Sequence, residues 1–80
     1  MPSIRLHETS DPVVVYDLMR EAAARLIGIY ASHRTAAGLG GADIAEIRAI
    51  RAQVAAVDAA DMEKQRRLTA ELRARAQALV

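Results

Sequence analysis

The sequence has 80 residues, a formal net charge of +1 at pH 7 and no cysteine. This length allows one domain, and the absence of cysteine excludes disulfide bonds and thiolate-bound metal ions. A charge so close to zero excludes the strong electrostatic field that draws basic proteins to nucleic acid or to a membrane. No apolar run approaches the roughly 18–20 residues that span a bilayer, and we expect a cytoplasmic protein.

Residues 1–10 differ in pattern from the rest of the chain. Ile4 and Leu6 alternate with Arg5 and His7, which is the spacing of a β-strand. We therefore predict a short extended N-terminal arm over residues 1–10. Two interpretations of this arm stay open. It is either a loose chain end, or a strand that adds to the sheet of a partner or of a second copy.

The stretch from Asp11 to Arg34 has the pattern of one long amphipathic helix. Asp11 can cap free backbone amides, and Pro12 suits the first helical position. Beyond them, apolar side chains recur at spacings of three and four residues and form a wide apolar face. The pattern predicts a helix over about residues 12–34. Its apolar face is wider than two short, alanine-rich helices can readily cover.

A glycine-rich break over residues 38–41 separates this helix from a second one. Asp43 and Glu46 have the spacing of a capping box, in which each side chain bonds a free amide at a helix start. Apolar residues from Ile44 to Val57 continue the helical spacing. We predict a second helix over about residues 43–57.

The third predicted helix covers about residues 59–79 and begins with Asp58 as its cap. Leu68, Leu72 and Ala76 form its apolar line, which Gln65 interrupts. Opposite charges alternate four residues apart along another face, at Glu63, Arg67, Glu71 and Arg75. Such a ladder is typical of a helix face that is exposed to solvent.

These elements predict an all-α fold, either a small three-helix bundle or a helical hairpin. The helical domain would cover residues 11–80, after the extended arm of residues 1–10. Short loops between the helices favour antiparallel neighbours.

No catalytic, cofactor-binding or metal-binding residues are predicted. The two histidines, His7 and His33, do not have the spacing of a metal site, and the carboxylates are explained as caps or as ladder members. A dimeric helical enzyme could hold a small dianion with Arg20, Arg48, Arg51 and Gln53. Only the size and the fold class of the chain favour an enzymatic function, and such an analogy is weak evidence. We expect a non-enzymatic protein.

The wide apolar face instead indicates protein–protein interaction. Seven residues are the predicted contacts with a partner: Val14, Val15, Leu18, Met19, Leu26, Ile27 and Tyr30. Some of them must also line the core of the bundle, and the sequence does not divide the two groups. Tyr16 and Tyr30 are the expected anchors, because tyrosine combines a large apolar area with a polar tip.

The expected partner is a larger protein, for example a toxin enzyme. The bias toward alanine and arginine suggests a bacterial source, and small helical proteins of bacteria often inhibit a larger enzyme. The hypothesis is therefore an inhibitory partner, such as the antitoxin of a toxin–antitoxin pair, that masks an active site with its first helix. Two alternatives stay open: a self-assembling homo-oligomeric bundle that acts as a structural or adaptor module, and a dimeric DNA-binding regulator that uses the arginines of the second half.

Overall fold

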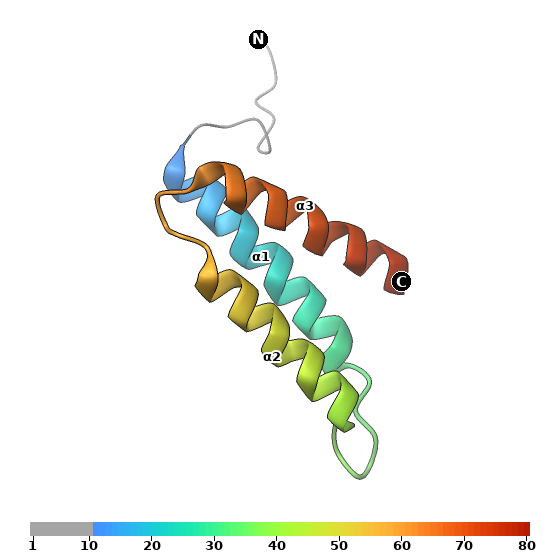
Figure 1. Ribbon diagram of the computed structural model, residues 1–80. Helices are drawn as coiled ribbons and strands as arrows, with labels where there is room; N and C mark the ends of the chain where they lie inside the picture. Colours follow the sequence, from blue (N-terminus) through green and yellow to red (C-terminus); the bar gives the residue numbers. More distant parts are fainter. Residues whose placement is uncertain (1–10) are drawn as a thin grey trace.

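The computed structural model describes residues 11–80, and the predicted extended arm of residues 1–10 lies outside the described residues. Three helices follow one another: α1 (Pro12–Ala31), α2 (Gly41–Ala56) and α3 (Met62–Leu79). The predicted all-α fold is confirmed, and the described part of the chain contains no strand. α1 lies between the other two helices and packs against both of them (Figure 1). α2 is antiparallel to α1, and α3 returns in the direction of α1.

The start of α1 is as predicted. The carboxylate of Asp11 accepts a hydrogen bond of 2.9 Å from the backbone N–H of Val13, and Pro12 occupies the first helical position. The helix ends at Ala31 rather than near residue 34. It ends there because Ser32 closes the last turn, with its hydroxyl donating a 2.6 Å hydrogen bond to the carbonyl oxygen of Ile29.

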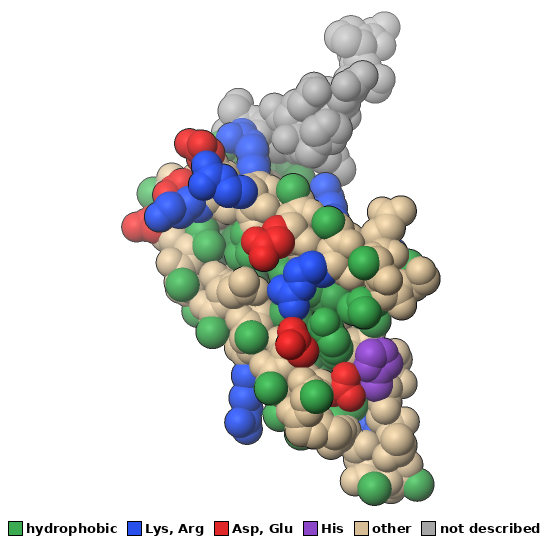
Figure 2. Space-filling view, turned by 45° about the vertical axis from the view of Figure 1, so that its right-hand side comes forward, with side chains coloured by type: hydrophobic (Ala, Val, Ile, Leu, Met, Phe, Trp, Pro, Cys, Tyr) green, Lys and Arg blue, Asp and Glu red, His purple; other side chains and the backbone are tan. Residues whose placement is uncertain are grey.

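The predicted capping box at the start of the second helix is wrong. α2 begins at Gly41, the capping position is Gly40, and no side chain bonds a free amide there. Asp43 therefore lies within the first turn of α2. Its carboxylate makes a 2.8 Å hydrogen bond with Nδ1 of His33, in the loop after α1, and Figure 2 shows a histidine beside an acidic side chain. The carboxylate thus connects the two ends of the α1–α2 loop.

The predicted cap of the third helix is also wrong. α3 begins at Met62 rather than at residue 59, and its cap is Asp61, whose carboxylate accepts a 3.0 Å hydrogen bond from the N–H of Lys64. Asp58 instead accepts a 2.8 Å hydrogen bond from the N–H of Ala60 and so closes a turn in the loop before the helix. Both aspartates accept hydrogen bonds from free backbone amides, but only Asp61 caps α3.

Gln65 does not interrupt the packing of α3, because its side chain is fully buried. Its Nε2 donates hydrogen bonds of 3.1 Å to the carbonyl oxygen of Asp58 and 2.9 Å to that of Ala59. These two bonds satisfy both hydrogens of the amide, whereas its buried oxygen Oε1 has no hydrogen-bond partner among the described residues. Gln65 therefore fixes the α2–α3 loop against the first turn of α3.

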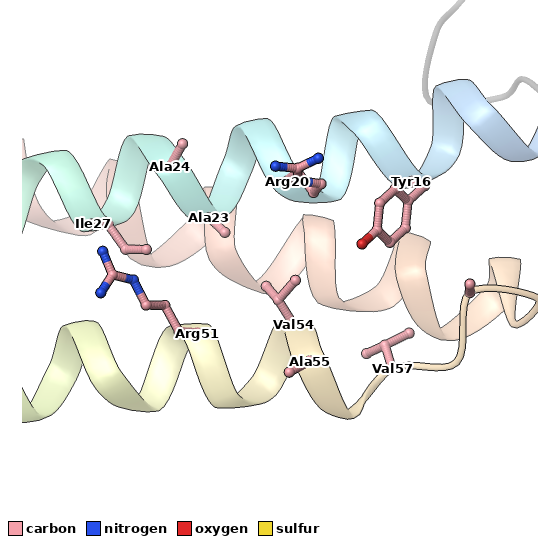
Figure 3. Close-up of a pocket in the computed structure, with 10 residues that line it drawn as sticks. Tyr16, Arg20, Ala23, Ala24, Ile27, Arg51, Val54, Ala55 and Val57 are labelled. Carbon is pink, nitrogen blue, oxygen red and sulfur yellow. The ribbon is translucent and has the colours of Figure 1, made fainter.

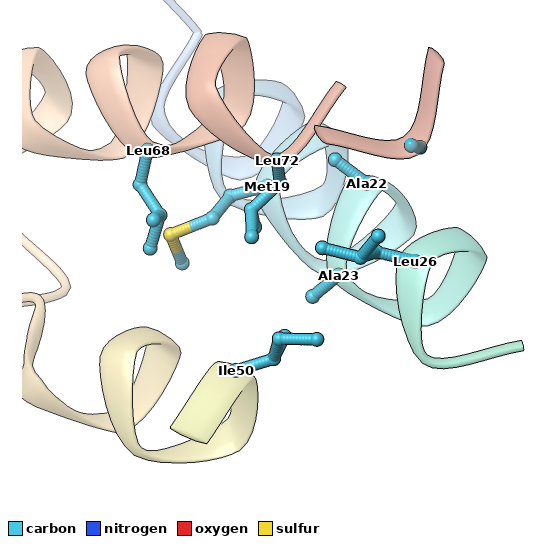
Figure 4. Packing of buried hydrophobic residues seen from close by; sticks show 8 residues of the cluster. Met19, Ala22, Ala23, Leu26, Ile50, Leu68 and Leu72 are labelled. Carbon is cyan, nitrogen blue, oxygen red and sulfur yellow. The ribbon is translucent and has the colours of Figure 1, made fainter. Parts of the chain in front are cut away.

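One cluster of buried hydrophobic side chains joins the three helices (Figure 4). α1 contributes four residues, α3 contributes three, and α2 contributes one: Met19, Ala22, Ala23 and Leu26; Leu68, Leu72 and Ala76; and Ile50. Only Ile47 is buried in α2 besides Ile50. The share of α2 in the core is thus much smaller than that of the other helices.

The predicted charge ladder on α3 is exposed except at its last member, Arg75. Arg67 pairs with Glu63 at 2.9 Å, and both side chains are largely in solvent. Arg75 turns away from the ladder toward α2, where it pairs with Glu46 at 3.0 Å and donates a 3.4 Å hydrogen bond to Gln53. Arg75 therefore connects α3 to α2 instead of facing open solvent.

Candidate functional site

A groove with a volume of about 460 Å³ runs between α1 and α2 (Figure 3). Residues of α1, of α2 and of the loop that follows α2 line it, and α3 contributes none. Its lining is mainly apolar and consists of Tyr16, Arg20, Ala23, Ala24, Ile27, Arg51, Val54, Ala55, Val57 and Ala59. Alanine makes up much of this wall, so an occupant could approach the backbones of both helices closely.

The groove continues toward the α1–α2 loop as a second hollow of about 380 Å³. Ile27 and Arg51 line both parts, and the second part adds Ala31, Leu39, Ile44, Ile47 and Arg48. We call the two parts together the α1–α2 groove. From Tyr16 to Ala31, α1 forms one wall over a length of about 22 Å at 1.5 Å per residue.

Local sequence explains why α2 leaves this surface uncovered. Ile50 and Ile47 point into the bundle and are buried, whereas Val54 and Val57 are half-buried and Ile44 is exposed over 37% of its surface. Val54 and Val57 pack against the edge of the core cluster and also line the groove. Ile44 lines the part of the groove nearer the α1–α2 loop.

The charged side chains that line the groove are all basic. Arg20, Arg48 and Arg51 line it, and no carboxylate does. The guanidinium of Arg20 lies over the ring of Tyr16, 6.0 Å from its centre, and Figure 3 shows Arg51 extending from α2 toward Ile27. Among the described residues, Arg48 and Arg51 have neither an ion pair nor a hydrogen bond.

Only some arginines elsewhere in the bundle differ from this pattern, since Arg73, for example, also has no ion pair among the described residues. Arg67 and Arg75 each pair with a glutamate, and Figure 2 shows basic and acidic side chains close to one another on the face that it presents. Asp17 and Glu21 lie beside Arg20, but outside the groove lining. The groove therefore combines an apolar lining with a purely cationic rim.

The structure divides the seven predicted partner contacts into two groups. Val15, Met19 and Leu26 are buried within the bundle, so they serve the fold. The other four are half-buried: Val14, Leu18, Ile27 and Tyr30. Ile27 lines the α1–α2 groove.

Tyr16 and Tyr30, the two expected anchors, are placed differently. The half-buried ring of Tyr16 lies at one end of the α1–α2 groove. Both tyrosines pack against the core cluster, but Tyr30 does not line the groove, and its ring makes a T-shaped contact with the ring of His33, with the ring centres 5.9 Å apart. Tyr16 is therefore the tyrosine available to a groove occupant.

Sequence reasoning missed the contribution of α2 to this surface. Its valines and Ile44 were placed on one apolar side of the helix, and Arg48 and Arg51 were considered as ligands of a dianion or as part of a DNA-binding surface. The available signal was the small size of the surrounding residues, since an alanine-rich pair of helices cannot fill the space beside larger aliphatic side chains.

Two other kinds of site are absent from residues 11–80. No group of three metal-ligating side chains occurs in this part of the chain, and none of its helices combines the length and apolarity that a bilayer span requires. Comparison of the chain with protein-family models, with curated proteins and with solved structures found no match.

Proposed function

We propose that this chain is a non-enzymatic protein-binding module that uses the α1–α2 groove to bind a larger protein. The observation that carries this proposal is the groove itself: a long apolar lining between two helices, edged by arginines that have no carboxylate partner there. Exposed apolar surface with a polar rim is the usual form of a protein interface, and arginine and tyrosine are frequent anchors in such interfaces.

Within this class we propose an inhibitory partner, such as the antitoxin of a bacterial toxin–antitoxin pair. Its support is the small size of the chain and the position of α1, which supplies both the core and one wall of the groove. A segment of the enzyme held in that groove would be fixed against the most deeply packed helix of the inhibitor. The bound inhibitor would thereby cover the surface of the enzyme around that segment.

Site-specific photo-crosslinking in the host cell tests the binding role directly. A photo-reactive amino acid replaces Ala55, an exposed residue of the groove, or Ala74, an exposed residue of α3 outside it. We expect one protein to be cross-linked in high yield from position 55 and not from position 74. Equal products at both positions, or none at position 55, would contradict the proposal.

Blocking the groove gives the matched functional test. Ala55→Trp should abolish co-purification of the cross-linked protein, whereas Ala74→Trp should leave it unchanged, because both alanines are exposed and only the first lines the groove. Expression of the captured enzyme alone should arrest growth, and co-expression of this chain should restore it. Growth that is unaffected by that enzyme would refute the antitoxin role while leaving the binding role intact.

A further inference from the structure

We propose that the occupant of the α1–α2 groove is an amphipathic α-helix of the partner protein, with carboxylates on both sides of its apolar stripe. This inference rests on the proposed function, because it names the chemistry of the partner at the same site. Four features support it: the length of the groove, the small residues of its lining, the charge of its rim, and the way this chain uses its own carboxylates.

The dimensions of the groove fit a helix. Its wall of about 22 Å corresponds to about 15 residues, or four turns, of an α-helix. The groove is lined by Ala23 and Ala24 of α1 and by Ala55 of α2. Such small side chains let a helix of the partner approach α1 and α2 to the usual interaxial distance of about 8–10 Å. Ile27 and Val54 would then pack between the apolar side chains of that helix, as in helix-in-groove recognition.

The charge of the rim selects acidic flanks on that helix. Arg48 and Arg51 are three residues apart, so their side chains lie about one turn apart along the rim that α2 provides. Glutamates with a similar spacing on the occupant would meet both guanidinium groups. Arg20 lines the groove from α1 and would meet a carboxylate on the other flank of the stripe. Lysine at these positions would face arginine and would be repelled.

A second copy of this chain supplies such a helix poorly. Six of the nine carboxylates of the described residues already serve its own fold: Asp11 and Asp61 cap helices, Asp58 closes a turn, and Asp43, Glu46 and Glu63 pair with basic side chains. Asp17 and Glu21 are exposed four residues apart on α1, but the apolar face of that helix is already buried in its own core. Two copies that docked groove to groove would also bring the arginines of one rim toward those of the other. The charge pattern therefore favours a different protein.

Selection from a displayed library tests this chemistry with the full chain as the target. The library presents helices of about 18 residues with one fixed stripe of leucine and alanine. The positions that flank the stripe vary among glutamate, glutamine and lysine. We expect the selected helices to carry glutamate at positions three or four residues apart and to bind about tenfold more tightly than their lysine counterparts. Selection without a charge preference, or the absence of any bound helix, would overturn the proposal.

Two charge reversals on this chain provide the control for net charge. Arg51→Glu and Arg73→Glu change the total charge equally, and both arginines are exposed on helices, but only Arg51 lines the groove. Arg51→Glu should shift the preference toward lysine-flanked helices, and Arg73→Glu should leave the selected helices unchanged. The same shift in both variants would show a general electrostatic effect and would overturn the assignment of the groove.

Two further experiments complete the test, one with this chain alone and one with its native partner. Sedimentation equilibrium should show a monomer, and a dimer that Ala55→Trp dissociates would show that a second copy fills the groove. A partner that is cross-linked from position 55 through a segment without acidic helical flanks would refute this inference but not the proposed function. Loss of cross-linking itself refutes the proposed function.

Discussion

The two sides of α1 are packed very differently. Toward α3, the central helix meets Leu68, Leu72 and Ala76, all of which are buried. Toward α2, it meets only two buried residues, Ile47 and Ile50, and the remaining aliphatic side chains of α2 stay partly in solvent. The α1–α3 pair therefore carries most of the packing, and α2 adds little to the core while it forms one wall of the groove.

This difference shows how a short chain divides its apolar residues between a buried core and a partly exposed surface. A domain of this size has a thin core, so each buried aliphatic side chain contributes a large part of the stability. α2 is rich in alanine, which favours the helix without filling space, so it needs few core contacts to stay helical. Its partly exposed aliphatic side chains belong to the surface that we propose as an interface.

The largest expected difference in stability is between substitutions at two neighbouring residues of α1. Leu26 is completely buried in the cluster, whereas Ile27 is half-buried and lines the groove. Leu26→Ala should lower the free energy of unfolding by about 2–5 kcal/mol, because it leaves a cavity among all three helices. Ile27→Ala should lower it by only about 1 kcal/mol, because part of that side chain is already in solvent.

Urea unfolding followed by circular dichroism measures both values. The two substitutions remove aliphatic side chains of the same size from adjacent positions, so each is the control for the other. Equal losses of stability would show that the groove wall is part of the core, and the distinction between the two sides of α1 would then fail.

The next effect concerns the connection between α2 and α3. Gln65→Ala removes the amide that donates to the carbonyl oxygens of Asp58 and Ala59, in a position without solvent access. We expect a loss of about 1–3 kcal/mol, because two carbonyl groups lose their partner and a cavity forms. Gln77→Ala, at an exposed position of the same helix, should change the stability by less than about 0.5 kcal/mol.

A loss at Gln65 no larger than that at Gln77 would show that the loop is held by other contacts. Hydrogen exchange of the α2–α3 loop provides a second readout. Its amides should exchange faster in Gln65→Ala and at an unchanged rate in Gln77→Ala.

Periodicity and end signals predicted the number and order of the helices, because apolar spacing along α1 and α3 directly reflects the side that each buries. The cap at Asp11 was also predictable, since Pro12 leaves few alternatives for a helix start. The starts of α2 and α3 were not predictable in this way. Asp43 bonds His33 instead of capping α2, and Gly40 takes the capping position without a side-chain bond. Asp58 closes a turn, and Asp61 caps α3.

The groove was less predictable than the fold. The sequence indicated a surplus of apolar surface on α1, but it could not show that Leu26 faces the core while its neighbour Ile27 faces the groove. That division depends on where α2 and α3 cross α1, which no local pattern contains. The sequence analysis grouped Arg20, Arg48 and Arg51 as possible ligands of a dianion, but it could not show that they line one groove, since Arg20 and Arg51 are far apart in the sequence.

The smallest expected effect concerns the polar contact that joins α3 to α2. Arg75 pairs with Glu46 across the bundle, and the Arg75 side chain is 29% exposed, whereas Arg67 pairs with Glu63 within α3 and is 71% exposed. A double-mutant cycle for Arg75→Ala and Glu46→Ala should give a coupling of about 0.5–1 kcal/mol, because partial burial strengthens the pair. The same cycle for Arg67 and Glu63 should give about 0.3 kcal/mol.

Hydrogen exchange along α2 distinguishes a bridge between helices from a merely local effect. If Arg75 holds α2 in place, Arg75→Ala should speed exchange in α2, which contributes little to the core, and Arg67→Ala should leave that exchange unchanged. Faster exchange confined to α3 in both variants would mean that Arg75 stabilises only its own helix. The apolar contacts of Ile47 and Ile50 would then suffice to hold α2 against the α1–α3 pair.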